Sequence, residues 1–411
     1  MNKLKDSGIP WIEEIPEHWK VASIKNLMFL FSGATPKSDN PSFWGGDIIW
    51  ITPADYISEN HYVNQGRRNI TTEGYNSCAT TLVPINSLIF SKRAPIGEVV
   101  LSGIPLCTNQ GCITCIPKDK IHSNYYYYTF RIAKKEFETL GSGTTFLEIS
   151  TSDFSNFKIP VPPLEEQERI STYLDEKCGE IDELIEVEQQ MISDLESYRQ
   201  AVITETVTHG LNPDVLTKPT AIPWISPIPE QWKEIRLKFL SRISTGDKDT
   251  IMANDEGEYP FFVRSPKIER INTYSYDGEA ILMAGDGVGA GRVFHHFIGK
   301  FDWHQRVYNM HELTYNIYGR FLFYFLLTNF HKLIDAGSAK STVDSVRLPM
   351  LTNFITLVPP LSEQKEISNY LDTKCAEIDE LIKVKQEKIE TLKQYRQSLI
   401  FEAVTGKITI V

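Results

Sequence analysis

The sequence predicts an α/β (α+β) protein: two globular domains joined by two long helices that form an antiparallel coiled coil, an internal tandem duplication with pseudo-twofold symmetry. Residues 162–208 and 359–405 are identical at 29 of 47 positions, and residues 9–20 and 222–233 both read IPWIxxIPExWK. The stretches between these repeats barely resemble each other. A duplicated frame that carries two unlike middle regions is typical of a protein that binds two different targets.

Each repeated segment is expected to form one long helix. Its apolar residues recur in alternating steps of four and three, the heptad pattern of a coiled coil, and a proline pair precedes it. We therefore place the first domain at residues 1–160, the first helix at 161–211, the second domain at 212–357 and the second helix at 358–411. The residues that we expect to pair the two helices are Leu174, Ile181, Ile185, Glu188, Leu371, Ile378, Ile382 and Lys385.

One position of this seam changes charge between the repeats. Glu188 in the first repeat corresponds to Lys385 in the second, and both lie near the middle of their helices. In an antiparallel pair, equivalent positions face each other only near the centre, so an ion pair between these two residues is one interpretation. The alternative is that each is a polar interruption of a solvated seam. An ion pair would disfavour the pairing of two like halves.

The composition is that of a globular chain, and its charge is unevenly distributed. The formal net charge is -11, of which residues 162–208 carry -10 and residues 359–405 carry -2, so the rest of the chain is close to neutral. Neutral middle regions leave DNA binding open but indicate help from a partner, because phosphate neutralisation supplies much of DNA affinity. No segment reaches the roughly 20 apolar residues of a membrane span, and the N-terminus has no apolar signal core. We therefore expect a cytoplasmic protein.

Three motifs occur in both halves of the chain. They are IPxxWxxxxxK near the start, a Gly-Ser segment (GSGTTFLEIS or GSAKSTVDSV), and PPLxEQxxIxxYLDxKxxxID at the start of the long helix. With these motifs the whole chain resembles the DNA-sequence specificity subunit of type I restriction-modification enzymes. The resemblance implies two target-recognition domains, each reading one half of a bipartite, asymmetric DNA site, with the helices setting the spacing.

The same resemblance implies which partners and cofactors to expect. The helices would dock two modification (methyltransferase) subunits, and two restriction (translocase and nuclease) subunits would join the complex on double-stranded DNA. The specificity subunit of that family has no chemistry of its own. We therefore expect no catalytic residue and no cofactor on this chain, with S-adenosylmethionine, ATP and magnesium bound only to partner subunits.

The motifs that suggest chemistry are weak. Residues 40–43 (NPSF) are similar to the Asn-Pro-Pro-aromatic motif of amino-methyltransferases, but the third residue is Ser, and a turn is the simpler interpretation. The glycine-rich run 285–291 precedes a predicted strand, whereas a dinucleotide site needs a helix there. Cys112 and Cys115 form a CxxC close to Cys107, but no fourth ligand of similar quality is evident, and we expect no metal.

Polar residues of the middle regions are candidates for DNA contacts. Arg suits guanine and Asn or Gln suits adenine in the major groove, whereas phosphate contacts position the protein without specifying sequence. The base-contact candidates are Arg93, Asn109, Gln110, Arg292, His304, Gln305 and Arg306, and the phosphate candidates are Lys92, Arg67, Arg264, Lys267 and Lys340. Gln110 and Gln305 recur in both halves although the bases should differ, so a structural or phosphate role is the alternative for them.

The aromatic runs at residues 125–128 and 321–325 are expected to be buried helices that fill the two domain cores, with base stacking as the functional alternative. Three classes of function are then compatible with the chain. The sequence favours the specificity subunit. A DNA-modifying enzyme lacks a catalytic motif, and a protein-interaction scaffold or standalone DNA-binding protein without a modification partner is the alternative.

Overall fold

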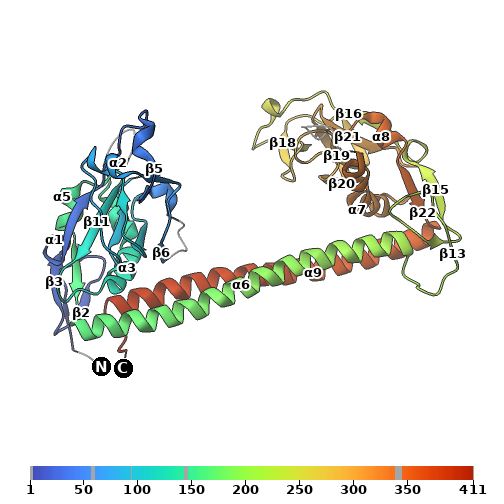
Figure 1. The fold of residues 1–411 in the computed structure, drawn as a ribbon. Helices are drawn as coiled ribbons and strands as arrows, with labels where there is room; N and C mark the ends of the chain where they lie inside the picture. Colours follow the sequence, from blue (N-terminus) through green and yellow to red (C-terminus); the bar gives the residue numbers. More distant parts are fainter. Residues whose placement is uncertain (1–2, 57–60, 94, 143–146, 338–344, 411) are drawn as a thin grey trace. The chain divides into compact units, whose positions relative to one another are not determined.

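The computed structural model describes residues 3–56, 61–93, 95–142, 147–337 and 345–410, and Figure 1 shows its fold. The chain forms two compact units: unit 1 comprises residues 1–188 and 387–411, and unit 2 comprises residues 189–386. Each unit combines one globular domain of helices and strands with part of both long helices. The predicted α/β architecture of two domains and two long helices is confirmed.

The two long helices are α6 and α9, with the bounds Leu164–His209 and Leu361–Val404. Most of the apolar residues that were predicted to pair them are buried, as the heptad pattern requires. These buried residues are Leu174, Ile181, Ile185, Leu371 and Ile378. Ile382 is instead partly exposed, so the seam is not closed at this position.

Charged pairs along the seam show that the helices run antiparallel within each unit. In unit 1 the guanidinium of Arg396 pairs with Asp182, and Lys388 Nζ lies 2.6 Å from Glu188 Oε1. The residue number rises along α6 as it falls along α9. The prediction that the seam is antiparallel therefore holds in this unit.

Unit 2 repeats one of these pairs with the helices exchanged. Arg199 Nε lies 3.1 Å from Asp379 Oδ1, and these residues are the repeat counterparts of Arg396 and Asp182. At the seam position that changes charge, Lys385 Nζ lies 3.0 Å from the sulfur of Met191. An ion pair of Lys385 with its counterpart Glu188 stays a prediction.

The domain of unit 1 is built on a five-stranded sheet of order β4-β11-β8-β9-β6, a three-stranded sheet of order β10-β5-β7, and the pairs β12-β3 and β1-β2. Most neighbours are antiparallel, but β10 runs parallel to β5 and β6 parallel to β9. The strands are β1 Leu4–Asp6, β2 Glu14–Pro16, β3 Lys20–Ser23, β4 Met28–Ser32, β5 Trp44–Ile51, β6 Tyr62–Val63, β7 Arg68–Ile70, β8 Leu88–Ser91, β9 Val99–Ser102, β10 Cys107–Thr108, β11 Cys112–Pro117 and β12 Lys158–Val161. The short helices are α1 Ile24–Leu27, α2 Thr72–Asn76, α3 Ser123–Ile132, α4 Lys134–Thr139 and α5 Thr151–Asn156.

The domain of unit 2 is built on one six-stranded sheet of order β16-β21-β19-β20-β17-β18, with the pairs β15-β22 and β13-β14 beside it. Its sheet differs from that of unit 1, as the unlike middle regions of the sequence predict. The strands are β13 Thr217–Lys218, β14 Ile228–Pro229, β15 Lys233–Arg236, β16 Arg242–Thr245, β17 Tyr259–Phe262, β18 Glu269–Ile271, β19 Tyr276–Ala284, β20 Phe294–Trp303, β21 Val307–His311 and β22 Ile355–Val358. The helices are α7 Gly319–Gly337 and α8 Leu348–Thr352.

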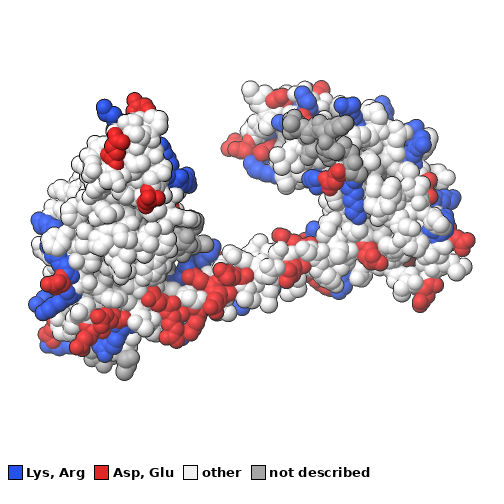
Figure 2. Space-filling model, viewed as in Figure 1, with Lys and Arg blue, Asp and Glu red and all other residues white. Residues whose placement is uncertain are grey.

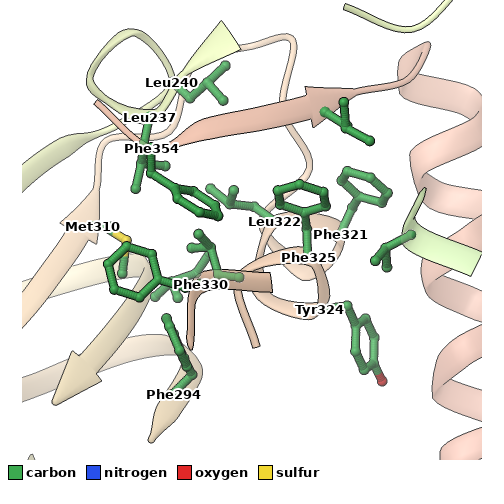
Figure 3. Packing of buried hydrophobic residues seen from close by; sticks show 14 of the residues in the cluster. Leu237, Leu240, Phe294, Met310, Phe321, Leu322, Tyr324, Phe325, Phe330 and Phe354 are labelled. Atoms are coloured by element: carbon green, nitrogen blue, oxygen red, sulfur yellow. The ribbon is translucent and has the colours of Figure 1, made fainter. Parts of the chain in front are cut away.

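Both aromatic runs are core helices. In α3 the rings of residues 125–128 are at most 4% exposed, and in α7 Phe321 and Phe325 are fully buried. Figure 3 shows Phe321, Leu322 and Phe325 of α7 turned into the same apolar core as Phe354. Base stacking by these rings is therefore excluded while the domains stay folded. Among the described residues, no helix is long and apolar enough to cross a membrane.

The repeated motif residues hold each domain on the helices. The indole N–H of Trp19 donates to Glu166 Oε2 over 2.8 Å, and that of Trp232 donates to Glu363 Oε2 over 3.1 Å. Each indole is at most 2% exposed and each Glu lies in the first turn of the helix that follows the domain. The Trp of the IPxxW motif and the Glu of the PPLxEQ motif are thus one interaction, made once in each unit.

Each of these Trp side chains also packs on the last turn of the other long helix. Gly406, with φ of +72°, leaves α9, and a Cβ there would lie 2.9 Å from Trp19 Cη2. Gly210, with φ of +81°, leaves α6, and a Cβ there would lie 3.3 Å from Trp232 Cζ2. Glycine suits both positions because a side chain is strained at this φ and the first also lacks room. Each domain therefore contacts the start of one helix and the end of the other.

The glutamine of the same motif satisfies buried backbone groups. Gln364 is fully buried; its Oε1 accepts the backbone N–H of Tyr318 over 2.7 Å, and its Nε2 donates to the carbonyls of Asn316 and Pro359 over 2.9 and 2.8 Å. Gln167 has the same role in unit 1. An amide that satisfies three backbone groups explains why neither repeat places an apolar residue here.

We predict that Gln364→Ala lowers the free energy of unfolding of unit 2. The substitution leaves one N–H and two carbonyls buried without the Gln364 side chain as a partner. Each unsatisfied group lowers the free energy of unfolding by about 1 to 3 kcal/mol. The measurement is the urea midpoint of the purified chain. The control is Gln394→Ala on the same helix, because Gln394 is exposed and its Nε2 donates to the exposed side chain of Glu390. Equal midpoints for the two variants would contradict the prediction.

Candidate nucleic-acid interface

Three loops of unit 2 meet at a cluster of polar side chains. Asp286, in the β19–β20 loop, is the centre: its Oδ1 accepts from Arg264 Nη1 over 3.0 Å and its Oδ2 from Arg306 Nη1 over 3.1 Å. The Asp286 side chain is 15% exposed, whereas those of Arg264 and Arg306 are 48% and 63% exposed. One shielded carboxylate thus fixes two guanidinium groups whose remaining donors face solvent. We call these three residues the Asp286 cluster.

The turn between β20 and β21 supplies the neighbours of this cluster. Gln305 is exposed, and its Nε2 donates to Asp249 Oδ2 over 3.1 Å. His304 is different, because its side chain is only 4% exposed and its Nδ1 accepts the backbone N–H of Arg306 over 2.9 Å. Burial lowers the pKa of His304 below its ordinary value, so the ring is neutral at neutral pH. His304 therefore shapes the turn, and its contact with a base stays a prediction.

Two other predicted contacts of this half pair with acidic residues that are not part of the Asp286 cluster. Arg292 Nη2 lies 2.5 Å from Asp335 Oδ1, a residue of α7. Lys267 Nζ lies 3.2 Å from Glu269 Oε2 and its side chain is 72% exposed, which suits a phosphate contact. Lys340 lies outside the described residues.

In unit 1 the predicted contacts fall on the loop that follows β8 and on the β10–β11 turn. Lys92 Nζ lies 2.7 Å from Glu148 Oε1 and its side chain is only 14% exposed, so it stabilises the loop and is poorly placed for a phosphate. Arg93 is half-buried, and its backbone forms an isolated antiparallel bridge with Glu148. The Oδ1 of Asn109 accepts the backbone N–H of Gly111 over 2.9 Å. In a bidentate contact of Asn109 to adenine, Oδ1 would accept from the base in addition to Gly111.

Gln110 and Gln305 occupy similar turns in the two units. A Cβ on Gly33 would lie 2.2 Å from the carbonyl oxygen of Asn109, and a Cβ on Gly246 would lie 1.9 Å from that of Trp303. Gly33 follows β4 and Gly246 follows β16, and the lack of a side chain at each lets the backbone lie directly against this turn. The partners of the two amides differ: Gln110 Oε1 accepts from Thr35 Oγ1 over 2.5 Å, whereas Gln305 donates to Asp249. The turn is therefore common to the two units, whereas the residues that its Gln side chain bonds differ.

Sequence reasoning missed the acidic residues that organise these loops. Asp286, Asp249 and Glu148 each pair with a predicted contact residue. The one signal in the sequence that could have identified them is the presence of an acidic residue in a loop rich in Arg, Lys or Gly. Sequence reasoning also did not predict the stacking of Arg68 on Trp44, in which the guanidinium carbon lies 3.6 Å from the ring centroid.

The cysteines near the β10–β11 turn are free thiols. Cys107, Cys112 and Cys115 are buried, and the hydroxyl of Tyr56 donates to Cys112 Sγ over 3.1 Å. Burial raises the pKa of the Cys112 thiol to about 12, so it stays protonated at neutral pH. Within the described part of the chain, no group of three or more His, Cys, Asp or Glu residues could hold a metal ion.

Comparison with known proteins identifies the class. The family described as "Type I restriction modification DNA specificity domain" matches the chain twice, at residues 16–197 and 229–391. The chain is 38% identical over 178 residues to the type I restriction enzyme MjaIX specificity subunit of Methanocaldococcus jannaschii, covering 43% of this chain and 40% of that protein. It is 33% identical over 183 residues to the EcoDI specificity subunit of Escherichia coli, covering 44% and 40%. The chain thus belongs to the type I restriction-modification DNA specificity family, and the matched part spans about two fifths of these relatives.

A solved structure shares the fold over almost the whole chain. A chain from work on complex assembly and conformational transition of the type I R-M system superposes with a TM-score of 0.75, at 18% identity, over 96% of this chain and 99% of that one. The earlier resemblance to this family is confirmed.

We predict that acid weakens unit 2. Burial lowers the pKa of His295, His304, His311 and His331, so these rings are neutral when folded. Below the ordinary pKa of about 6.5 the unfolded chain takes up protons that the folded chain does not, and the free energy of unfolding falls until the pH drops below the folded pKa values. The urea midpoint should therefore be lower at pH 5.5 than at pH 7.5.

His304→Asn provides the control for this effect. The amide oxygen can accept the Arg306 N–H that Nδ1 accepts now, but it does not titrate. The variant should lose less stability between the two pH values than the wild type. A midpoint independent of pH, or the same loss in both proteins, would contradict the assignment of neutral, buried histidines.

Proposed function

We propose that this chain is the non-catalytic DNA-sequence specificity subunit of a type I restriction-modification system, and that each domain reads one half of a bipartite, asymmetric DNA site. One observation carries the proposal: the same Trp–Glu and Gln contacts hold two domains whose exposed polar loops differ. The Asp286 cluster in unit 2 has two exposed Arg side chains. The corresponding loops of unit 1 present Gln110 and Thr35 instead. Unlike donors should select unlike bases.

The Asp286 cluster suits base reading better than phosphate binding alone. A free Arg side chain loses much conformational entropy when it binds, whereas Arg264 and Arg306 are already held by one carboxylate. Each guanidinium retains unused N–H donors in the planar arrangement that pairs with guanine O6 and N7. Asp286 also offsets part of the positive charge of the two Arg side chains, which limits their affinity for phosphates. Base contacts should therefore contribute a larger share of their binding energy than phosphate contacts do.

A second exposed surface supports docking of modification subunits. Beside the buried seam, both long helices expose large apolar side chains at helical spacing, and a helix with two apolar faces needs a further partner. On α6 these are Leu184, Val187, Met191 and Tyr198, and on α9 they are Leu381, Val384 and Tyr395, all 43% to 57% exposed. Figure 2 shows acidic side chains gathered on the part of the helices that belongs to unit 1. This surface would take two modification subunits, one on each unit.

The partners would supply all of the chemistry. S-adenosylmethionine would bind to the modification subunits, and ATP and magnesium to two restriction subunits. The near-neutral domains fit this division, because a complex that includes larger subunits can supply the phosphate contacts that this chain lacks. A standalone DNA-binding protein is the outcome that would emerge if the chain bound its DNA site equally well without any partner.

Exchange of one domain tests the modular reading directly. Replacing residues 20–160 with the same region of a relative of different specificity should change one half of the methylated motif and leave the other half intact, because the Trp19–Glu166 bond lies outside or at the edge of the exchanged segment. The measurement is the set of methylated sites in a host that also expresses the modification subunit. A change in both halves would contradict independent readers.

Arg306→Ala tests base reading by the Asp286 cluster. If Arg306 pairs with guanine, the variant should lose about 1 to 3 kcal/mol of binding free energy on cognate DNA and should relax the motif at one position of the second half-site. The matched control is Lys267→Ala, which should weaken binding to all sequences alike and reduce the salt dependence by about one unit of slope. A uniform loss for Arg306→Ala, with discrimination unchanged, would assign Arg306 to the backbone instead.

A further inference from the structure

Two apolar side chains in the loops of Asp286 and Asp249 are almost fully exposed to solvent. Val288 is 97% exposed and Ile251 is 89% exposed. A single exposed apolar residue is ordinary on a protein surface. These two, however, lie two residues from the carboxylates of Asp286 and Asp249, which hold Arg264, Arg306 and Gln305 in place. The position in the loops, and not the exposure alone, distinguishes them.

The loop that carries Val288 is tightly folded. Ala290 N–H donates to the carbonyl of Gly287 over 3.0 Å, and Gly291 N–H donates to that of Ala284 over 2.9 Å. Ala290 is fully buried, whereas Val288, two residues earlier, is almost fully exposed. Gly289 lies so close to Arg264 that a Cβ would be 2.8 Å from its carbonyl oxygen. The loop is therefore anchored on the cluster, and it presents one apolar side chain to solvent at its tip.

Ile251 is held in a similar way. It lies in a short 3-10 turn, Thr250–Met252, whose first residue follows Asp249. The Oδ1 of Asp249 accepts the backbone N–H of Ile251 over 3.2 Å, and its Oδ2 accepts from Gln305 Nε2 over 3.1 Å. One carboxylate thus fixes an apolar side chain and a base-reading candidate relative to each other.

The chemistry of base edges indicates what these side chains contact. In the major groove, thymine is the base that adds an apolar group, the 5-methyl, to its hydrogen-bonding edge. Because Val288 lies two residues after Asp286, the carboxylate that holds two guanine-compatible Arg side chains, we infer that Val288 packs on the 5-methyl group of a thymine next to the base read by the Asp286 cluster, with Ile251 as a second apolar contact. This inference rests on the proposed function and extends it to a residue class that the hydrogen-bonding candidates do not include.

An apolar wedge between base steps is the competing role for a bare aliphatic side chain. Wedges are usually Phe, Leu, Ile, Met or Pro in the minor groove, and they kink the duplex. Val288 is shorter, and its loop contains Asp286, which holds two Arg side chains that suit major-groove edges. The two roles respond differently to removal of the thymine methyl, because a wedge contacts the faces of the bases and not that methyl.

The experiment replaces each thymine of the second half-site, one at a time, by uracil, which lacks only the methyl group. Binding of the complex with its modification subunits is measured on each duplex. For the wild type, one substitution should raise Kd about three- to fivefold, the effect of burying one methyl group. Val288→Ala should bind thymine-containing DNA more weakly by a similar factor and should no longer distinguish thymine from uracil at that position.

The control variant is Leu216→Ala, an exposed aliphatic residue next to β13 and far from Asp286 in the chain. It should keep the full response to uracil. The inference is overturned if no uracil substitution weakens the wild type, if the half-site has no thymine, or if Val288→Ala keeps the wild-type response. Equal weakening on both duplexes would assign Val288 to a wedge. Failure of the proposed function is distinguishable, because the wild type would then not discriminate cognate from unrelated DNA at all.

Discussion

The hydrogen bond between a buried Trp indole and a Glu in the first turn of a long helix is the interaction on which the rest of the structure depends. It is made by Trp19 and Glu166 in unit 1 and by Trp232 and Glu363 in unit 2. Because each indole also packs on the glycine that ends the other helix, a single side chain fixes its domain against both helices. The donor is buried, so loss of its acceptor would leave an unsatisfied group as well as a looser domain.

This constraint explains which parts of the chain repeat and which differ. Many of the residues shared by the two halves dock a domain on the helices or pair the helices with each other. Asp175 and Asp372, for example, accept from the hydroxyls of Tyr128 and Tyr324 on the core helices. None of these contacts involves the loops of the Asp286 cluster or the loop that Lys92 and Glu148 hold. The loops can therefore change without loss of the docking, which is what a family of readers with different targets requires.

The frame could be predicted from the sequence, whereas the details of the interface could not. Identity between repeats, heptad spacing and aromatic runs are local signals, and they located α6, α9, α3 and α7. The role of His304, by contrast, depends on burial in the folded turn, and Lys92 is held by Glu148, 56 residues further along the chain. Arg292 was predicted to contact a base, and no pattern in the sequence indicated that it pairs with Asp335 of α7. Ion pairs of this kind leave no periodic pattern.

In the proposed function, two unlike domains on one repeated frame read two unlike DNA half-sites. The most direct measurement is single-molecule sequencing of the methylated bases in a host that expresses this chain with its modification subunit. The account predicts a motif of two different specific parts separated by several unspecified base pairs, with centres about one helical turn apart. A single continuous motif, or a palindrome with two identical halves, would contradict it.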